Sequence, residues 1–185
     1  MARGMVDNWP KLTDSRRIPV SPWLEVVARD VQFSPEASVE TYYAVAQPHY
    51  VAAVAVTPER RILLVRQYRP AIERFSLELP AGTLEENEGP ADAMVRELLE
   101  ETGHPARAIT LMGKTATCSN RIDNSTYSFF IEAGERVQGF VEEPGVSVRS
   151  VSAGELRASI LSGEFAEQTH LGVIALAMCR GLLTI

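Results

Sequence analysis

One segment, from Gly82 to Gly103, constrains this chain more than any other. It places glycines, acids and an arginine at fixed offsets, in the order Gly82, Glu88, Arg96-Glu97-Leu98, Glu100-Glu101 and Gly103. Proline suits the first turn of a helix, and glycine suits the left-handed residue just past its end. Pro90 and Gly103 therefore predict a single helix over residues 90–102, preceded by a turn.

The predicted helix has an apolar side and an acidic side. Its apolar residues recur at spacings of three and four and are expected to pack against the protein, namely Ala91, Met94, Val95 and Leu98. Glu97 and Glu101 lie one turn apart on another face, with Glu100 beside them.

Local electrostatics disfavour this acidic cluster. The last turn of a helix carries partial negative charge, and each pair of like charges four residues apart costs about 0.2–0.5 kcal/mol. A divalent cation would reverse the sign, and Mg²⁺ binds a few carboxylates while sharing its shell with substrate phosphates. The alternative is a solvated acidic face with a salt bridge from Asp92 to Arg96.

The segment resembles the signature motif of the Nudix hydrolases. That motif has glycine, glutamate, arginine-glutamate, an apolar residue, glutamate-glutamate and glycine at these offsets, and every charged and glycine position agrees. One position departs, because His104 stands where the family usually has an apolar residue. Glu88 would be a peripheral contributor, or else a solvated loop acid.

The resemblance implies a metal site. Glu97 and Glu101 would be the main ligands, with Glu100 assisting directly or through water, and Arg96 would orient Glu97. The backbone carbonyl of Ala81 would be a further ligand. The implied cofactor is Mg²⁺, with Mn²⁺ as the alternative.

Hydrolysis of a diphosphate also needs a base to accept a proton from the attacking water. In the relatives that cleave ADP-ribose, this base is usually a glutamate on a mobile loop well after the motif. The matching stretch here, residues 139–145, offers Glu142 and Glu143. The alternative is that both are solvated loop acids.

The order of predicted elements extends the resemblance to about residues 23–183. Two hairpins precede the motif and three strands and two helices follow it, at 23–33 with 39–47, 50–56 with 61–68, then 109–117, 125–133, 146–151, 156–162 and about 167–183. This order resembles the Nudix α/β/α sandwich, an α/β fold with a mixed sheet, preceded by the small antiparallel β-subdomain of ADP-ribose pyrophosphatases.

The resemblance also divides the chain into two domains. Residues 1–48 would form a polar lead-in, to about residue 22, and the β-subdomain, while residues 49–185 would form the Nudix hydrolase domain. In such relatives the subdomain often forms a dimer whose partner contributes to the substrate site. A homodimer is therefore expected.

Residues before the motif favour a nucleoside diphosphate sugar as substrate. Residues 66–70 and 77–82 resemble the lead-in to the motif in hydrolases of such substrates. A guanidinium binds phosphate well, so Arg69 is a candidate substrate contact; the alternative is a pair with Glu73 or Glu78. Glu78 is expected near the site, supporting the metal cluster or holding an arginine.

One loop departs from the ADP-ribose hydrolases. Many of them carry a proline-containing loop beyond the motif, where this chain has Cys-Ser-Asn-Arg-Ile-Asp-Asn over residues 118–124. Another sugar nucleotide therefore remains open as the substrate. Arg121 and Asp123 are candidate contacts to the terminal sugar or its phosphate, whereas Asn120 and Asn124 taken alone indicate a turn.

Composition sets limits on this interpretation. A chain of 185 residues with 45% hydrophobic content can bury one good-sized core. The net charge of -6, with no basic run, argues against nucleic acid as a partner but not against a nucleotide. Cys118 and Cys179 have no metal-like companions, and neither a signal peptide nor a membrane span is indicated, so a cytoplasmic protein is expected.

The sequence thus predicts a metal-dependent hydrolase that cleaves a nucleoside diphosphate sugar, with ADP-ribose first, into a nucleoside monophosphate and a sugar phosphate. One alternative is a nucleoside triphosphate pyrophosphohydrolase. Another is a non-catalytic nucleotide-binding sensor, although the complete motif counts against it. Tyr50 and His170 receive no role, because packing explains residues of their type at such positions.

Overall fold

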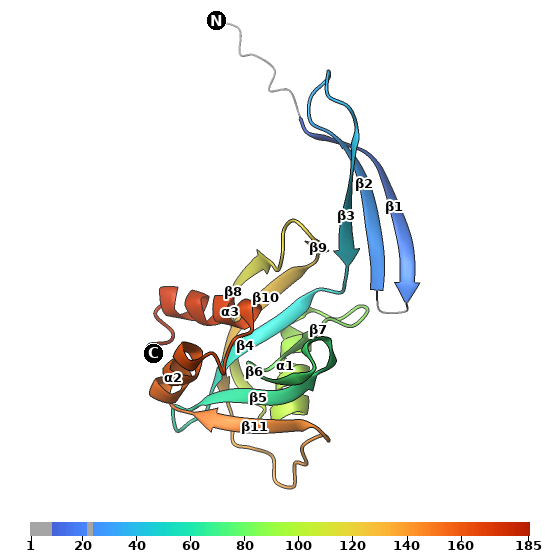
Figure 1. Cartoon of the computed structure of the whole chain (residues 1–185). Helices are drawn as coiled ribbons and strands as arrows, with labels where there is room; N and C mark the ends of the chain where they lie inside the picture. Colours follow the sequence, from blue (N-terminus) through green and yellow to red (C-terminus); the bar gives the residue numbers. More distant parts are fainter. Residues whose placement is uncertain (1–8, 22–23) are drawn as a thin grey trace, which may run out of the picture. The chain divides into compact units, whose positions relative to one another are not determined.

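The computed structural model of the chain describes residues 9–21 and 24–185. The chain divides into two compact units (Figure 1). The smaller unit comprises residues 1–47 and 116–124, and the larger unit comprises residues 48–115 and 125–185. The division into domains at residue 48 and the role of the first domain in dimerisation stay predictions.

The smaller unit is a four-stranded sheet in the order β1-β2-β3-β9. Three long antiparallel strands, β1 (Lys11–Ser21), β2 (Leu24–Gln32) and β3 (Glu40–Ala46), are joined by a short parallel strand, β9 (Ile122–Asp123), which pairs with β3. The hairpin of β2 and β3 confirms the first predicted hairpin within the described residues.

Strand β1 corrects the prediction of a loose lead-in up to about residue 22. Every residue of β1 is exposed, so no apolar alternation marks it as a strand in the sequence. The ladder to β2 holds it, together with charge pairs such as Arg16 with Asp30 at 3.0 Å. The remaining positions of the lead-in, 1–8 and 22, lie outside the described residues.

The larger unit contains a seven-stranded mixed sheet. Its main path is β11-β5-β4-β10-β8, while β6 pairs with β5 and β7 pairs with β4. Strand β10 runs parallel to β4, and the other pairings to β4 and β5 are antiparallel. The strands are β4 (Tyr50–Val56), β5 (Ile62–Arg69), β6 (Arg74–Glu78), β7 (Ala81–Thr83), β8 (Ala106–Ala116), β10 (Ser125–Ala133) and β11 (Val146–Val151).

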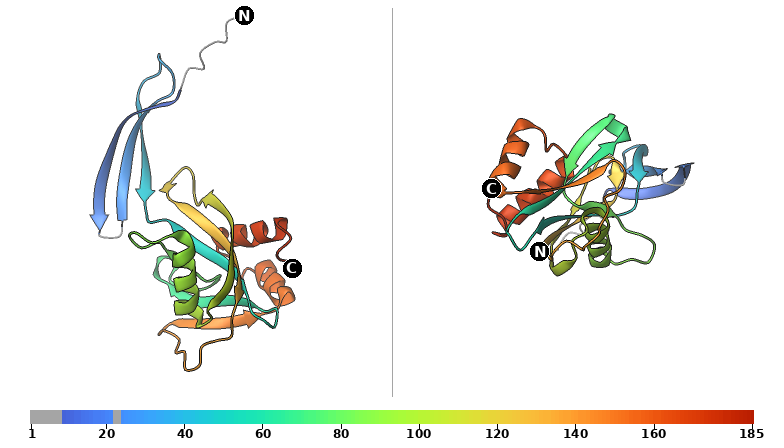
Figure 2. Two further views of the ribbon diagram at one scale, coloured as in Figure 1. Left: turned by 180° about the vertical axis from the view of Figure 1, so that it is seen from behind. Right: turned by 90° about the horizontal axis from the view of Figure 1, so that it is seen from below.

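Helices cover both faces of this sheet (Figure 2). Successive side chains of a strand point to opposite faces. On β4, Val51 and Ala53 therefore pack on the side of α1 (Pro90–Thr102), whereas Ala52 and Val54 pack on the side of α2 (Ala153–Ser162) and α3 (Gln168–Cys179). This α/β/α sandwich with a mixed sheet confirms the predicted fold class.

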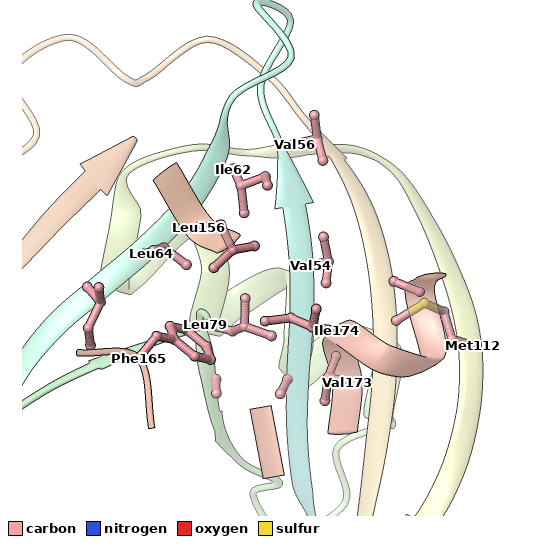
Figure 3. Close-up of a cluster of buried hydrophobic side chains, with 14 residues drawn as sticks. Val54, Val56, Ile62, Leu64, Leu79, Met112, Leu156, Phe165, Val173 and Ile174 are labelled. Carbon is pink, nitrogen blue, oxygen red and sulfur yellow. The ribbon is translucent and has the colours of Figure 1, made fainter. Parts of the chain in front are cut away.

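The core between the sheet and the last two helices is built from large apolar side chains (Figure 3). Leu156 from α2 and Ile174 from α3 pack with Phe165, which lies between the two helices, against Leu64 of β5 and Leu79. All five side chains are buried. This core fixes the strands that carry the candidate site.

Helix α1 has the predicted bounds, but its buried face differs from the predicted stripe. Met94 and Leu98 are buried as expected, whereas Ala91 is exposed and Val95 is 37% exposed. Thr102, which the predicted stripe does not include, is buried, and its hydroxyl donates to the carbonyl of Leu98 at 2.6 Å. A threonine whose hydroxyl bonds to a carbonyl of its own helix can be buried, but a search for apolar residues at helical spacing does not find it.

No helix of the described residues is long and apolar enough to span a membrane.

Candidate active site

The end of α1 is fixed by a glycine directly after the acidic cluster. Gly103 has a φ of +73°, and its N–H donates to the carbonyl of Leu99 at 2.9 Å. A Cβ on Gly103 would lie 2.4 Å from Cγ of Phe140, so the aromatic ring occupies the space that a side chain would need. Gly103 therefore serves both the helix end and the packing of the loop over residues 134–145, which contains Phe140.

Arg96 gathers three acids around one guanidinium. Its Nε and Nη2 donate to the two carboxylate oxygens of Glu88, each at 2.9 Å, and its Nη1 donates to Glu97 at 2.9 Å and Glu100 at 3.1 Å. A planar guanidinium that makes these contacts fixes the positions of its partners. Glu88 is thus bound, not merely solvated, and the alternative pair of Arg96 with Asp92 is wrong.

Gly82 brings the backbone of β7 against Glu97. A Cβ on Gly82 would lie 2.0 Å from both Cδ and Oε1 of Glu97. Only glycine leaves the carboxylate this position. Burial raises the pKa of Glu97, although Arg96 opposes the shift.

Ala81 binds the second main acid of the cluster. Its N–H donates to Oε2 of Glu101 at 2.9 Å, which ties the last turn of α1 to β7. Burial raises the pKa of Glu101 to about 7, and the charge of Glu97 adds to the shift despite the hydrogen bond from Ala81. Burial thus disfavours the charged form of both carboxylates, and neighbouring glutamates add to the effect.

The donor chemistry of this cluster fits a hard divalent cation. Glu97, Glu100 and Glu101 supply carboxylate oxygens, and Ala81 supplies a backbone carbonyl. Arg96 forms salt bridges with Glu97 and Glu100. In residues 9–21 and 24–185, no three carboxylate, imidazole or thiol side chains converge closely enough to hold a metal ion. Arg96 binds Oε1 of Glu97 and Oε2 of Glu100, so a cation would be bound through the other oxygen of each carboxylate once these side chains converge.

Glu78 holds Arg69 beside the cluster. The Glu78 side chain is only 3% exposed, and its two oxygens accept from Nε and Nη2 of Arg69. This pair is one of the alternatives that the sequence left open, and Glu73 is not the partner. Among the described residues, none binds Nη1 of Arg69, whose side chain is 39% exposed.

The two candidate bases differ in their surroundings. Glu142 is bound by Arg136, at 2.9 Å, and by the N–H of Val148, at 3.3 Å. Glu143 is exposed on the same loop. Neither contacts the carboxylates of α1 in the described residues, so the structure does not bring the candidate base to the cluster.

Arg121 belongs to the smaller unit. Its carbonyl accepts from the N–H of Val45 at 2.7 Å as β9 joins β3, and the residue is exposed. Its role as a substrate contact stays a prediction.

Two residues without a predicted role lie beside the cluster. His170 is fully buried, and its ring accepts from the N–H of Leu79 and contacts the hydroxyl of Tyr50. Tyr50 and His170 are 120 positions apart in the sequence. No local pattern links residues so distant, so only the fold could reveal this contact.

Comparison with known proteins agrees with this geometry. A family model described as the NUDIX domain matches residues 47–168. The chain is 35% identical over 109 residues to an ADP-ribose pyrophosphatase of Bacillus subtilis (strain 168), covering 59% of this chain and 58% of that protein. It is 32% identical over 114 residues to a methanol dehydrogenase activator of Bacillus methanolicus, covering 60% of this chain and 62% of that protein. The chain thus matches about three fifths of the length of these curated relatives.

The fold also has a close counterpart among solved structures. The crystal structure of an ADP compounds hydrolase superposes with a TM-score of 0.76 and 19% identity, over 94% of this chain and 97% of that chain. At this identity the likeness shows the fold. Because the NUDIX model covers more than half of the 185 residues, the predicted resemblance is confirmed and the chain belongs to the Nudix family.

Proposed function

We propose that the chain hydrolyses the diphosphate bond of a nucleoside diphosphate sugar, with ADP-ribose as the first candidate. The products would be a nucleoside monophosphate and a sugar phosphate. The observation that carries the proposal is the pair Glu97 and Glu101, which Gly82 and Ala81 hold side by side. Similarity to a protein named ADP-ribose pyrophosphatase supports the substrate.

The acids of α1 would hold a divalent cation, Mg²⁺ or Mn²⁺. When bound, the cation would neutralise phosphate oxygens and make water more acidic. Glu97, Glu100 and Glu101, with the carbonyl of Ala81, would be its protein ligands. Arg96 would position Glu97, since its Nη1 already binds that carboxylate at 2.9 Å.

Arg69 would bind an oxygen of the substrate diphosphate. Glu78 occupies Nε and Nη2 of Arg69 and so fixes the plane of the guanidinium, which leaves Nη1 as the donor to substrate. Arg121 would contact the terminal sugar or its phosphate.

Glu142 or Glu143 would accept the proton from the attacking water. Glu142 would first have to leave Arg136 and the N–H of Val148, whereas Glu143 is already exposed. Replacing each by glutamine separately distinguishes them, because only the base should lower kcat strongly while KM stays similar.

The smaller unit would form a homodimer. Its sheet exposes large apolar and aromatic side chains, including Ile18, Val20, Tyr42 and Tyr43. Such exposed side chains are typical of interfaces when they are contiguous. The net charge of -6 supports neither nucleic acid nor an acidic membrane surface as a partner, and the free Cys118 and Cys179 suit the cytoplasm.

Product analysis tests the proposal and its two alternatives. The protein and its Glu97→Gln variant are incubated with Mg²⁺ and ADP-ribose, GDP-mannose, other sugar nucleotides and nucleoside triphosphates, and the products are separated by chromatography. A monophosphate and a sugar phosphate from wild type alone would support the proposal. A monophosphate and diphosphate from a triphosphate would favour the pyrophosphohydrolase, and binding without turnover would favour the sensor.

A further inference from the structure

His170 is a buried histidine whose protonation pattern is set by its neighbours. The N–H of Leu79 points at Nδ1 with a distance of 3.1 Å. A backbone N–H can only donate, so Nδ1 must carry a lone pair and the ring proton must be on Nε2. Nε2 lies 3.2 Å from the hydroxyl oxygen of Tyr50, which can accept that proton's hydrogen bond. Burial lowers the pKa of His170, which agrees with a neutral ring.

Tyr50 holds the imidazole in its plane. The two rings are stacked, with centroids 6.0 Å apart and an angle of 10° between their planes. Tyr50 is also the first residue of β4 and lies opposite Thr83 of β7. The pair thus links α3 to the strands that flank the carboxylate cluster.

The segment that His170 binds is the one that holds the two main acids. It follows Glu78 and runs from Leu79 to Gly82. Ala81 donates to Glu101, and Gly82 leaves room for Glu97, while Pro80 has no N–H to offer. Two hydrogen bonds therefore fix the start of this segment. The N–H of Leu79 donates to His170, and the carbonyl of Pro80 accepts from the N–H of Ala53 at 3.1 Å.

We propose that His170 is a positioning residue for the cation site, whose imidazole fixes residues 79–82 so that Ala81 and Gly82 hold Glu101 and Glu97 in place. Tyr50 orients the imidazole through the contact of its hydroxyl with Nε2. This inference rests on the proposed function, in which these two acids bind the divalent cation. It assigns to α3, on the far side of the sheet from α1, a role in the geometry of the site.

Two substitutions at His170 separate positioning from simple packing. His170→Asn keeps an acceptor for the N–H of Leu79, because the asparagine oxygen can take the place of Nδ1. His170→Leu keeps an apolar volume but removes the acceptor. Val173→Ala, a core truncation in the same helix, serves as the control for lost packing.

The measurements are the Mn²⁺ dissociation constant by calorimetry, the hydrogen exchange of the Ala81 amide and the kcat and KM for ADP-ribose. His170→Leu should weaken Mn²⁺ binding about 10-fold to 100-fold, the range for residues that orient metal ligands, and should speed exchange of the Ala81 amide. His170→Asn should stay within about threefold of wild type in Mn²⁺ affinity, because it retains the acceptor on which that effect depends. Val173→Ala should lower the melting temperature without either effect.

Unchanged Mn²⁺ affinity and Ala81 exchange in His170→Leu would overturn the inference and leave His170 a core residue. If that variant does not fold, Tyr50→Phe decides, because it removes only the hydroxyl and should still speed Ala81 exchange. A wild type that binds no Mn²⁺ would also overturn the inference. A wild type that binds Mn²⁺ but cleaves no sugar nucleotide would refute the proposed function alone, since binding and exchange still report on His170.

Discussion

Replacing Gly82 by alanine tests whether the site requires Glu97 to lie against the backbone of β7. The new Cβ would lie 2.0 Å from Cδ and Oε1 of Glu97 and 2.5 Å from Oε2. Non-bonded carbon atoms rest about 3.5–4.0 Å apart. The carboxylate must therefore move by about 1.5–2 Å, the difference between these distances.

This displacement should cost activity far more than stability. A misplacement of about 1 Å can lower a rate about 100-fold, so we expect kcat/KM for ADP-ribose to fall at least that much, equivalent to about 2.7 kcal/mol. The clash is with the flexible end of a side chain, and Gly82 is not among the residues with positive φ. Alanine at a compatible glycine also gains about 0.4–1 kcal/mol by restricting the unfolded chain.

The assay compares Gly82→Ala with Gly154→Ala, whose Cβ would meet no atom within 4 Å. For each variant, kcat/KM, the Mn²⁺ dissociation constant and the melting temperature are measured. Gly82→Ala should lose activity and Mn²⁺ affinity at nearly constant melting temperature, and Gly154→Ala should retain both. Wild-type activity in Gly82→Ala, or a loss explained by a large drop in melting temperature, would refute the reasoning.

Other predictions follow from the buried charges of the larger unit. The pKa of Glu101 is raised to about 7 from 4.5, so its contribution to stability is present below pH 4.5 and lost as pH rises through 7. Between these pH values in EDTA, the free energy of unfolding by urea should fall by about 3 kcal/mol in wild type relative to Glu101→Gln, a difference that cancels the titrations of other groups. The pKa of His170, which lies among Glu167, Glu78 and Arg69, is lowered by burial, so its contribution is present above about pH 6.5 and lost as pH falls below that value. His170→Asn should reduce this acid loss in the same unfolding series, and an equal loss in both proteins would contradict the assignment. Arg69→Ala should cost about 3 kcal/mol, because it leaves the Glu78 carboxylate buried without its partner, and adding Glu78→Gln should recover most of that loss in thermal unfolding.

Sequence predicted the elements whose signals are local. Pro90 and Gly103 gave the bounds of α1, because a proline start and a glycine stop act on the helix that they flank. Ser152 and Glu155 form the capping box expected at the start of α2. Strands β10 and β11 also have their predicted bounds, since β10 is rich in aromatic and β-branched residues and β11 in valine, with loops on both sides.

Sequence did not predict what depends on pairing between distant residues. No side chain of β1 is buried, and β6 and β7 are short strands around Pro80 that pair with β5 and β4 respectively. The motif identified the acids of the cluster but not the contact of Gly82 with Glu97, which arises because β7 packs against α1. His170 lies beyond the reach of any such motif, because its contact to Leu79 spans 91 positions.

Burial of the acidic cluster both lowers the stability of the metal-free fold at neutral pH and suits the proposed binding of a cation. Burial, with the charges of neighbouring glutamates, raises the pKa values of Glu97 and Glu101, and Arg96 is shared with Glu88. Mutations that relieve such a cluster would therefore be expected to stabilise the metal-free fold at neutral pH. A ligand that binds only the folded state adds about 2.7 kcal/mol at 100 times its dissociation constant, which is similar to the cost that Glu101 imposes at pH 7. The raised pKa values thus mark the carboxylates whose charged form a bound cation would stabilise, and this proposed use would account for acids at the end of α1 where bases would stabilise the helix better.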